Sequence, residues 1–170
     1  WFQNILLSSG FELRQNIVLL HWSGEKAAAM IAPQGIRIRP MQESDLYTVT
    51  KVDLASFGYF WHNTLDALQR AYSQSNYATV SEDSSGMIGY QISTGNPLGA
   101  HLARLAVLPE AQGRGAGSAL VSDLIQRMDV HQSGRLSVNT QADNAASLAL
   151  YEKMGFKRTG ECFPVLVFRL

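Results

Sequence analysis

An apolar strand that runs into a glycine-rich turn and then an amphipathic helix constrains this sequence more than any other feature. The strand is residues 105–109, and a Gln112-x-x-Gly115-x-Gly117 turn follows it and leads into helical apolar spacing from Leu120. The first turn of a helix carries backbone N–H groups without intrahelical acceptors, and the helix dipole adds positive potential there. Glycine lets the backbone adopt positive φ and approach a ligand closely. The segment therefore predicts an anion site, most often one for phosphate.

The glycine spacing excludes two common nucleotide-binding loops. A dinucleotide fingerprint requires Gly-x-Gly-x-x-Gly, but Ser118 stands at the third position after Gly113 and Gly115. A nucleoside-triphosphate loop requires a lysine directly after its last glycine, and no lysine follows these glycines. The expected phosphate ligand therefore belongs to another class.

A second segment downstream is predicted to form a short capped helix. Asp143 or Asn144 can cap its N-terminus, because a short acceptor side chain satisfies a free N–H group there. Gly155 fits the left-handed residue that ends such a helix. Three side chains between them share one face at spacing three, and these are Leu148, Tyr151 and Met154.

Both segments resemble the two signature motifs of the GNAT N-acetyltransferase superfamily. In that family the glycine loop holds the pyrophosphate of acetyl-coenzyme A. The second motif is an Asn-x-x-(Ala/Ser)-x-x-(Leu/Phe)-Tyr-x-x-x-Gly-Phe helix, and the chain carries this pattern from Asn144 to Phe156. The resemblance spans roughly residues 36–170. It implies an α/β (α+β) three-layer fold, with helices on both faces of a mixed central sheet and a splayed strand pair for the pantetheine arm.

Periodicity places the other elements in an order that agrees with this fold. Strands are predicted at residues 35–40, 77–82, 87–93, 100–108, 136–140, 156–161 and 165–170, the last two as a closing pair. Helices are predicted after Ser44 or Asp45, at roughly 64–73, after the glycine loop, and from Asn144. We therefore expect one GNAT domain over residues 35–170.

Residues 1–34 stand apart from this pattern. Residues 6–11 and 17–22 are similar to residues 151–156 and 165–168, and 145 residues separate the two Gly-Phe pairs. One interpretation is a remnant of a preceding GNAT-like domain, which would make this chain the C-terminal active domain of a tandem protein. In that copy Leu6 stands in place of Tyr151. The alternatives are an unrelated hairpin or an arm that pairs with a neighbouring subunit.

Composition excludes several classes of function. The 170 residues suit one domain with a real core, and 14 basic residues balance 14 acidic ones, which does not favour a nucleic-acid or membrane surface. The single cysteine, Cys162, is typical of a reducing compartment. No apolar run approaches the roughly 18 residues of a membrane span, and no signal peptide is evident. Without such segments we expect a cytoplasmic protein. The histidines are scattered singly, so we expect no metal site.

The resemblance implies which residues bind acetyl-coenzyme A. Backbone N–H groups from Gln112 to Gly117 would hold the pyrophosphate, with Arg114 adding charge. The pantetheine arm would pair with residues 105–107, and the N–H of Val107 is the expected oxyanion donor. Asn144 would bond the arm, while Lys153 either reaches the phosphates or is solvated. The expected set is Leu105, Ala106, Val107, Gln112, Gly113, Arg114, Gly115, Ala116, Gly117, Ser118, Asn144 and Lys153.

Acetyl transfer to an amine also requires a general acid and a base. Tyr151 is the candidate acid for the leaving thiolate, and the alternative is a tyrosine that only packs. Relatives of the ribosomal-protein alanine acetyltransferases often use a glutamate where Asn139 stands here. His101 is the preferred base, since its strand resembles that of the serotonin acetyltransferases and imidazole titrates near neutrality. Ala103 replaces the second histidine of that arrangement, and Glu82 is a weaker alternative.

An aromatic segment between the two early helices is the expected acceptor site. Its side chains could wall an apolar pocket or fill core, and they are Phe57, Tyr59, Phe60, Trp61 and His62. No acidic cluster indicates a polycationic acceptor, which leaves a peptide or protein N-terminus, a lysine or a small amine. The sequence thus predicts an acetyl-coenzyme A-dependent N-acetyltransferase, monomeric or homodimeric, that works by direct attack in a ternary complex. The competing interpretations are an idle coenzyme A-binding sensory module and a pure interaction domain.

Overall fold

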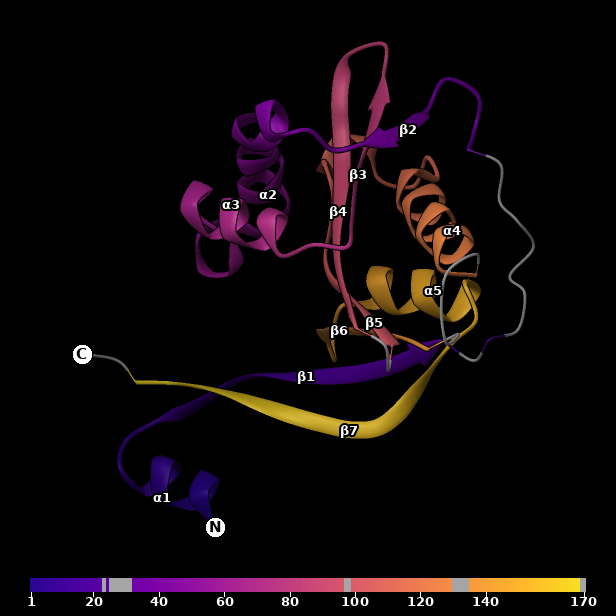
Figure 1. Ribbon diagram of the computed structural model, residues 1–170. Helices are drawn as coiled ribbons and strands as arrows, with labels where there is room; N and C mark the ends of the chain where they lie inside the picture. The colour runs from indigo at the N-terminus through magenta and orange to yellow at the C-terminus, as the bar shows by residue number, and fades with distance from the viewer. Residues whose placement is uncertain (23, 25–31, 97–98, 130–134, 169–170) are drawn as a thin grey trace.

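A seven-stranded mixed sheet of order β2-β3-β4-β5-β6-β1-β7 forms the centre of the molecule (Figure 1). The computed structural model describes residues 1–22, 24, 32–96, 99–129 and 135–168. The strands are β1 (Glu12–Trp22), β2 (Arg37–Pro40), β3 (Tyr77–Asp83), β4 (Gly86–Asn96), β5 (Gly99–Val107), β6 (Leu136–Gln141) and β7 (Phe156–Val167). The helices are α1 (Phe2–Ser8), α2 (Leu46–Trp61), α3 (Leu65–Ser73), α4 (Ala116–Asp129) and α5 (Ala145–Lys153), with 3-10 turns at Glu43–Asp45 and Pro109–Ala111.

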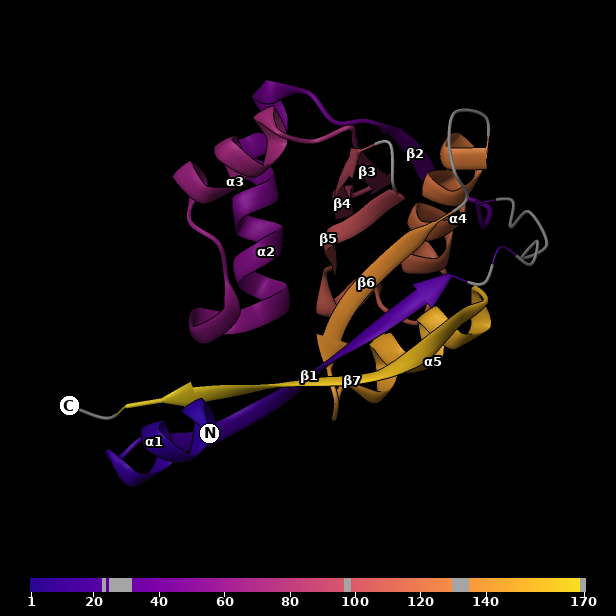
Figure 2. The ribbon, with the colours of Figure 1, turned by 60° about the horizontal axis from the view of Figure 1, so that its bottom comes forward.

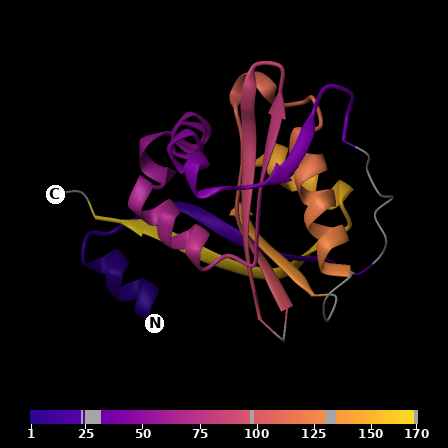
Figure 3. The same ribbon diagram turned by 45° about the horizontal axis from the view of Figure 1, so that its top comes forward.

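Two apolar layers enclose the sheet, as the sequence predicted. Helices α2 and α3 cover one face, and α4 and α5 cover the other (Figure 3). The first layer packs α2 and α3 side chains such as Val49 and Leu68 on Tyr90 and Ile92 of β4. The second layer packs α4 and α5 on the opposite face and is centred on Leu102, Val121, Leu124, Leu136, Val138, Tyr151 and Met154. Full burial of such side chains contributes about 1.5–3 kcal/mol each.

The strands β5 and β6 are parallel neighbours over only a short stretch. Their register pairs Ala100 to Leu102 with Leu136 to Val138. Beyond these pairs β5 continues to Val107 and β6 to Gln141, but the two strands are no longer paired with each other. This separation is the splayed strand pair that the sequence predicted, and it leaves a wedge in the sheet.

The N-terminal strand β1 lies inside the sheet, between β6 and β7. The predicted closing pair of strands at 156–161 and 165–170 is wrong, because β7 is a single strand that pairs with β1 along its length. Gly160 and Pro164 both lie within this strand. Gly160 adopts a φ of 89° where the register shifts, and Pro164 is tolerated because β7 is an edge strand.

A buried ion pair joins α2 to the sheet. The Nε and Nη2 atoms of Arg104 donate to the two carboxylate oxygens of Asp53 at 2.7 and 2.9 Å, and the N–H of Asn63 donates to the same carboxylate at 2.6 Å. The buried Tyr90 hydroxyl also donates to Asp53. Arg104 reaches α2 because Ala103 is an extra residue in β5, which shifts the register against β4.

Replacing Asp53 by Ala is expected to lower the free energy of unfolding by about 3–5 kcal/mol, because the guanidinium would remain buried without its partner. The matched control is Asp66→Ala, which removes an exposed ion pair with Arg70 on the surface of α3. That change should cost roughly 0.3–0.5 kcal/mol. Urea denaturation of both variants measures the difference, and equal losses would contradict a structural role for the buried pair.

Candidate active site

A cavity of about 450 Å³ opens where β5 and β6 separate, between the glycine loop and α5. Eleven of the twelve predicted cofactor residues line it, and they come from both signature motifs and from the end of β5. The lining is Ser56, Phe57, Leu105, Ala106, Val107, Ala111, Gln112, Gly113, Gly115, Ala116, Gly117, Ser118, Asn144, Ala146, Ser147, Ala149, Leu150 and Lys153. The fold thus brings residues more than 30 positions apart in the sequence to one wedge.

The glycine loop holds the N-terminus of α4 at one wall of this cavity. Gly113 and Gly115 adopt φ values of 74° and 90°, which side chains other than glycine rarely allow. The Nε2 atom of Gln112 donates to the carbonyl of Val107 at 3.1 Å and so ties the loop to the end of β5. A Cβ atom at Gly117 would lie 3.2 Å from Leu150, so glycine allows α4 and α5 to approach each other.

The N–H groups of β5 that face the wedge can be identified from its pairing with β4. The N–H of Leu108 donates to the carbonyl of Ile88 in β4 at 2.8 Å. Because the N–H direction alternates along a strand, the N–H groups of Val107 and Leu105 point the opposite way, toward the wedge. The carbonyl of Val107 also points away from β4, since it accepts from Ser56 and Gln112.

Helix α5 forms the opposite wall and begins at a side-chain cap. The Oδ1 atom of Asn144 accepts from the N–H of Ser147 at 3.0 Å, and its Nδ2 atom donates to Gln141 at 3.3 Å. Lys153 lies at the other end of the helix and also lines the cavity. The wall therefore has the Asn144 amide, which is engaged in the helix cap, at one end and the Lys153 ammonium group at the other.

The Arg114 side chain is directed elsewhere. Its Nη2 atom lies 2.8 Å from the carboxylate of Asp83, at the turn between β3 and β4. Arg114 is the one predicted cofactor residue outside the cavity lining. In this structure it fastens the glycine loop to the neighbouring hairpin.

Tyr151 is buried behind the cavity wall. Its ring centroid lies 5.5 Å from that of Phe156, and its neighbour Leu150, not Tyr151 itself, appears in the lining. Burial raises the pKa of the Tyr151 phenol well above its usual range, so the hydroxyl stays protonated throughout the physiological range. That protonation state suits a proton donor and excludes a base.

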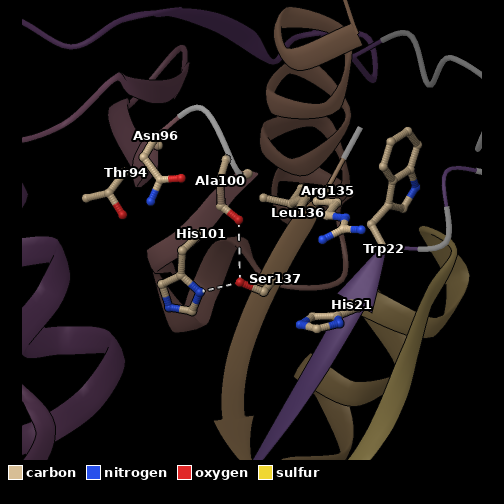
Figure 4. A pocket seen from close by; sticks show the side chains of 11 residues that line it. His21, Trp22, Thr94, Asn96, Ala100, His101, Arg135, Leu136 and Ser137 are labelled. Atoms are coloured by element: carbon tan, nitrogen blue, oxygen red, sulfur yellow. Dashed lines mark hydrogen bonds between the residues drawn. The ribbon is translucent and has the colours of Figure 1, made fainter. Parts of the chain in front are cut away.

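His101 lies in a different hollow, of about 510 Å³, near the beginning of β5 (Figure 4). Its Nδ1 atom is 2.9 Å from the hydroxyl of Ser137, and the hollow also contains His21 and Arg135. In the described ranges the two cavities share no lining residue. Val107 lies six positions after His101 along β5, which corresponds to about 20 Å. Burial lowers the pKa of His101, so its ring is neutral at pH 7.

The aromatic segment expected to bind the acceptor divides at Gly58, which adopts a φ of 65° and interrupts α2. Phe57 lines the first cavity, under the guanidinium of Arg104 at 3.5 Å from the ring centroid. The remaining aromatic side chains do not line it: Tyr59 is 87% exposed, and Phe60 lies 5.5 Å from Arg14 of β1. The segment is anchored by the carbonyl of Trp61, which accepts from Arg104 at 2.6 Å, and by His62, whose Nδ1 atom lies 2.9 Å from the Tyr59 carbonyl.

Three residues at or beside the cavity were not predicted from the sequence: Ser56, Asp53 and Arg104. A signal for the ion pair exists in the sequence, because Asp53 interrupts the apolar face of a helix and Arg104 interrupts an apolar strand. Buried charges of this kind need partners. Ser56 carries no such signal, since its hydroxyl lies within reach of Val107 only after folding.

The described residues contain no group of three or more His, Cys, Asp or Glu side chains that could hold a metal ion. Within the same ranges, no helix is long and apolar enough to cross a membrane.

Comparison with known proteins identifies relatives of this architecture. Residues 46–156 match the Acetyltransferase (GNAT) family. Mycothiol acetyltransferase from Kocuria rhizophila is 29% identical over 143 residues, which cover 74% of this chain and 47% of the relative. [Ribosomal protein bS18]-alanine N-acetyltransferase from Escherichia coli is 40% identical over 57 residues, covering 34% of this chain and 38% of the relative. The chain spans about half or less of the length of these relatives.

Solved structures show the same fold at low identity. A GCN5-related N-acetyltransferase from Sphaerobacter thermophilus superposes with a TM-score of 0.79 at 13% identity, covering 97% of this chain and 55% of that one. A tandem GNAT protein from the clavulanic acid biosynthesis pathway superposes with a TM-score of 0.67 at 14% identity, covering 96% and 56%. Because the family match covers well over half of the chain and includes both the glycine loop and the Tyr151 helix, this chain belongs to the GNAT acetyltransferase family.

Proposed function

We propose that this chain transfers an acetyl group from acetyl-coenzyme A to a primary amine, by direct attack in a ternary complex. The observation that carries the proposal is the wedge between β5 and β6. There the N-terminus of α4, the free edge of β5 and the polar ends of α5 converge on one cavity. This arrangement offers an anion site, a strand edge and an oxyanion donor within one continuous lining.

The residues of the cavity fit coenzyme A in two ways. The N-terminal amides of α4 and the amides of the glycine loop suit the pyrophosphate, and Lys153 adds a positive charge at the rim. The N–H of Leu105, which faces the wedge, suits an extended amide-bearing arm that pairs with β5 as an added strand. Lining residues Ser56 and Phe57 lie on the side of α2 and would face the acceptor amine.

The proposed chemistry assigns a role to each of these groups. The amine attacks the thioester carbonyl, and the N–H of Val107 stabilises the negative charge that develops on the carbonyl oxygen. When the carbon–sulfur bond breaks, the leaving thiolate takes a proton from the Tyr151 hydroxyl, which requires that this group, now behind the wall that Leu150 forms, reaches the sulfur in the ternary complex. The proton lost by the attacking amine leaves through ordered water, since His101 lies in the other hollow.

One observation favours a second function, a coenzyme A-binding module without catalysis. The cavity lining contains no carboxylate and no imidazole among the described residues, so no base touches the amine directly. The two functions differ in acceptor-dependent thiol release, which an active enzyme shows and an idle module does not.

Filling the cavity tests where coenzyme A binds. Ala149 is exposed on α5 and lines the cavity, so Ala149→Phe occupies the space without disturbing the core. Calorimetry is expected to show coenzyme A binding weakened by about 10-fold or more, or 1.4 kcal/mol. The matched control is Ala145→Phe on the same helix, which is exposed but outside the lining and should bind within about 2-fold of the unchanged protein. Equal weakening in both variants would place the ligand elsewhere.

Tyr151→Phe removes the proposed proton donor and keeps the ring that packs on Phe156. We expect kcat to fall by about 100-fold or more, with coenzyme A affinity unchanged, because the hydroxyl acts only in the transition state. Tyr47→Phe, on the exposed face of α2, is the control and should leave kcat unchanged. An unchanged kcat in the Tyr151 variant would assign its hydroxyl no part in the reaction.

His101→Gln separates a water relay from a histidine base. Because His101 lies about 20 Å along β5 from Val107, we expect the pH profile of kcat/KM to keep its apparent pKa. Initial rates from pH 5 to 10 measure the profile. A flattened acidic limb together with a loss of about 100-fold would make His101 the base after all.

A further inference from the structure

The β1–β7 ribbon extends beyond the rest of the sheet. Only Ile17 to His21 of β1 pair with β6, so the preceding part of β1 and the end of β7 project as a two-stranded ribbon with α1 at its tip (Figure 2). Two strands alone are marginally stable in water. The projecting end exposes large apolar side chains, namely Trp1, Phe2, Ile5, Leu13, Phe163 and Phe168. Such a surface at a sheet edge indicates a binding interface.

The ribbon has an approximate internal two-fold symmetry. A helix, a left-handed glycine, a phenylalanine and a strand occur twice, as α1, Gly10, Phe11, β1 and as α5, Gly155, Phe156, β7. The two glycines have φ values of 91° and 88°. The antiparallel ladder is centred on the pairs Ile17↔Phe163 and Val18↔Cys162. A rotation about this centre therefore exchanges the two helix–strand units.

The two ends of the ribbon differ in what covers them. At one end β6 pairs with Ile17 to His21, and the buried Leu20 and Trp22 pack against α5 side chains. The symmetry maps this stretch onto Cys162 to Leu166 of β7, with apolar Val165 and Val167 in place of Leu20 and Trp22. Phe163, which corresponds to Val18, is 48% exposed. At the second end β7 thus has the apolar pattern of the stretch of β1 that β6 covers. Among the described residues, no strand pairs with β7 there on its outer side.

We propose that a second GNAT-type domain covers this end, and that its strand equivalent to β6 pairs with the outward-facing backbone groups of Cys162 and Leu166 in β7, while Pro164 between them, which has no N–H, accepts through its carbonyl alone. A sheet built like this one presents a strand that is antiparallel to its ribbon strand, as β6 is to β1. In such an assembly α1 and β1 are the last helix and strand of the second domain, and the ribbon is shared between the two. The matches to two mycothiol acetyltransferases cover 47% and 58% of those relatives, so each of them has room for a second domain.

A second copy of this chain is a different occupant and makes a different prediction. The β6 strand of a second copy is already paired with its own β1. Two copies could meet only through their β7 edges, which would make the 170-residue chain dimerise.

Hydrogen exchange measured by mass spectrometry tests the proposal. It compares the product of the whole open reading frame that contains Trp1–Leu170 with the 170-residue chain alone. In the former, the amides of Cys162 and Leu166, which face the open edge of β7, and those of α1 are expected to exchange at least about 100-fold more slowly, because they are paired or packed. Phe163→Asp in the longer protein should abolish this difference. The exposed Tyr47→Asp, 65% exposed on α2, should leave it intact.

Two results would overturn the proposal. One is exchange at Cys162 and Leu166 that is equally fast in both proteins. The other is a dimer of the 170-residue chain in sedimentation velocity that Phe163→Asp dissociates, since a second copy would then occupy the edge. Neither result depends on coenzyme A, so failure here and failure of the proposed function are distinguishable.

Discussion

The short parallel pairing of β5 and β6 is the constraint on which the rest of the site depends. After three residue pairs the strands diverge, and the N–H groups of Leu105 and Val107 remain available on the edge of β5. A fully paired sheet would satisfy these groups internally and leave no space between α4 and α5. The wedge is kept open by the contacts that direct each strand outward. On one side Gln112 and Ser56 bind the carbonyl of Val107, and on the other side β6 pairs with β1.

The parts of the site that the sequence predicts are those set by local backbone chemistry. The glycine loop requires positive φ at Gly113 and Gly115, and the structure has it at both residues. Asn144 was one of two residues predicted to cap its helix, and its side chain forms the cap. In each case the physical requirement acts over a few neighbouring residues, so the residue types alone identify it.

The features that the sequence did not predict arise from contacts between distant segments. The extra residue Ala103 changes which side chains of β5 face α2, so Arg104 meets Asp53. The alternation of apolar and polar residues in the sequence does not reveal such a bulge. His101 lies nearer the start of β5 and lines another hollow. The single strand β7 depends on a partner from the other end of the chain. With β1 absent from the expected sheet, this one strand was predicted as a closing pair at 156–161 and 165–170.

The N-terminal strand also takes part in the candidate site, although it lines none of its walls. The carbonyl of Asn16 accepts from the N–H of Ala142 at 2.8 Å, and the side chain of Gln15 donates to Asp143 at 2.7 Å. These two contacts hold the turn that leads directly into Asn144 and α5. Gln15 and Asn16 lie in the projecting half of the ribbon, where β1 has no pairing with β6. When this half of the ribbon opens locally, the two contacts to the turn before α5 break as well. Any partner that stabilises this half of the ribbon therefore also stabilises the α5 wall of the cavity.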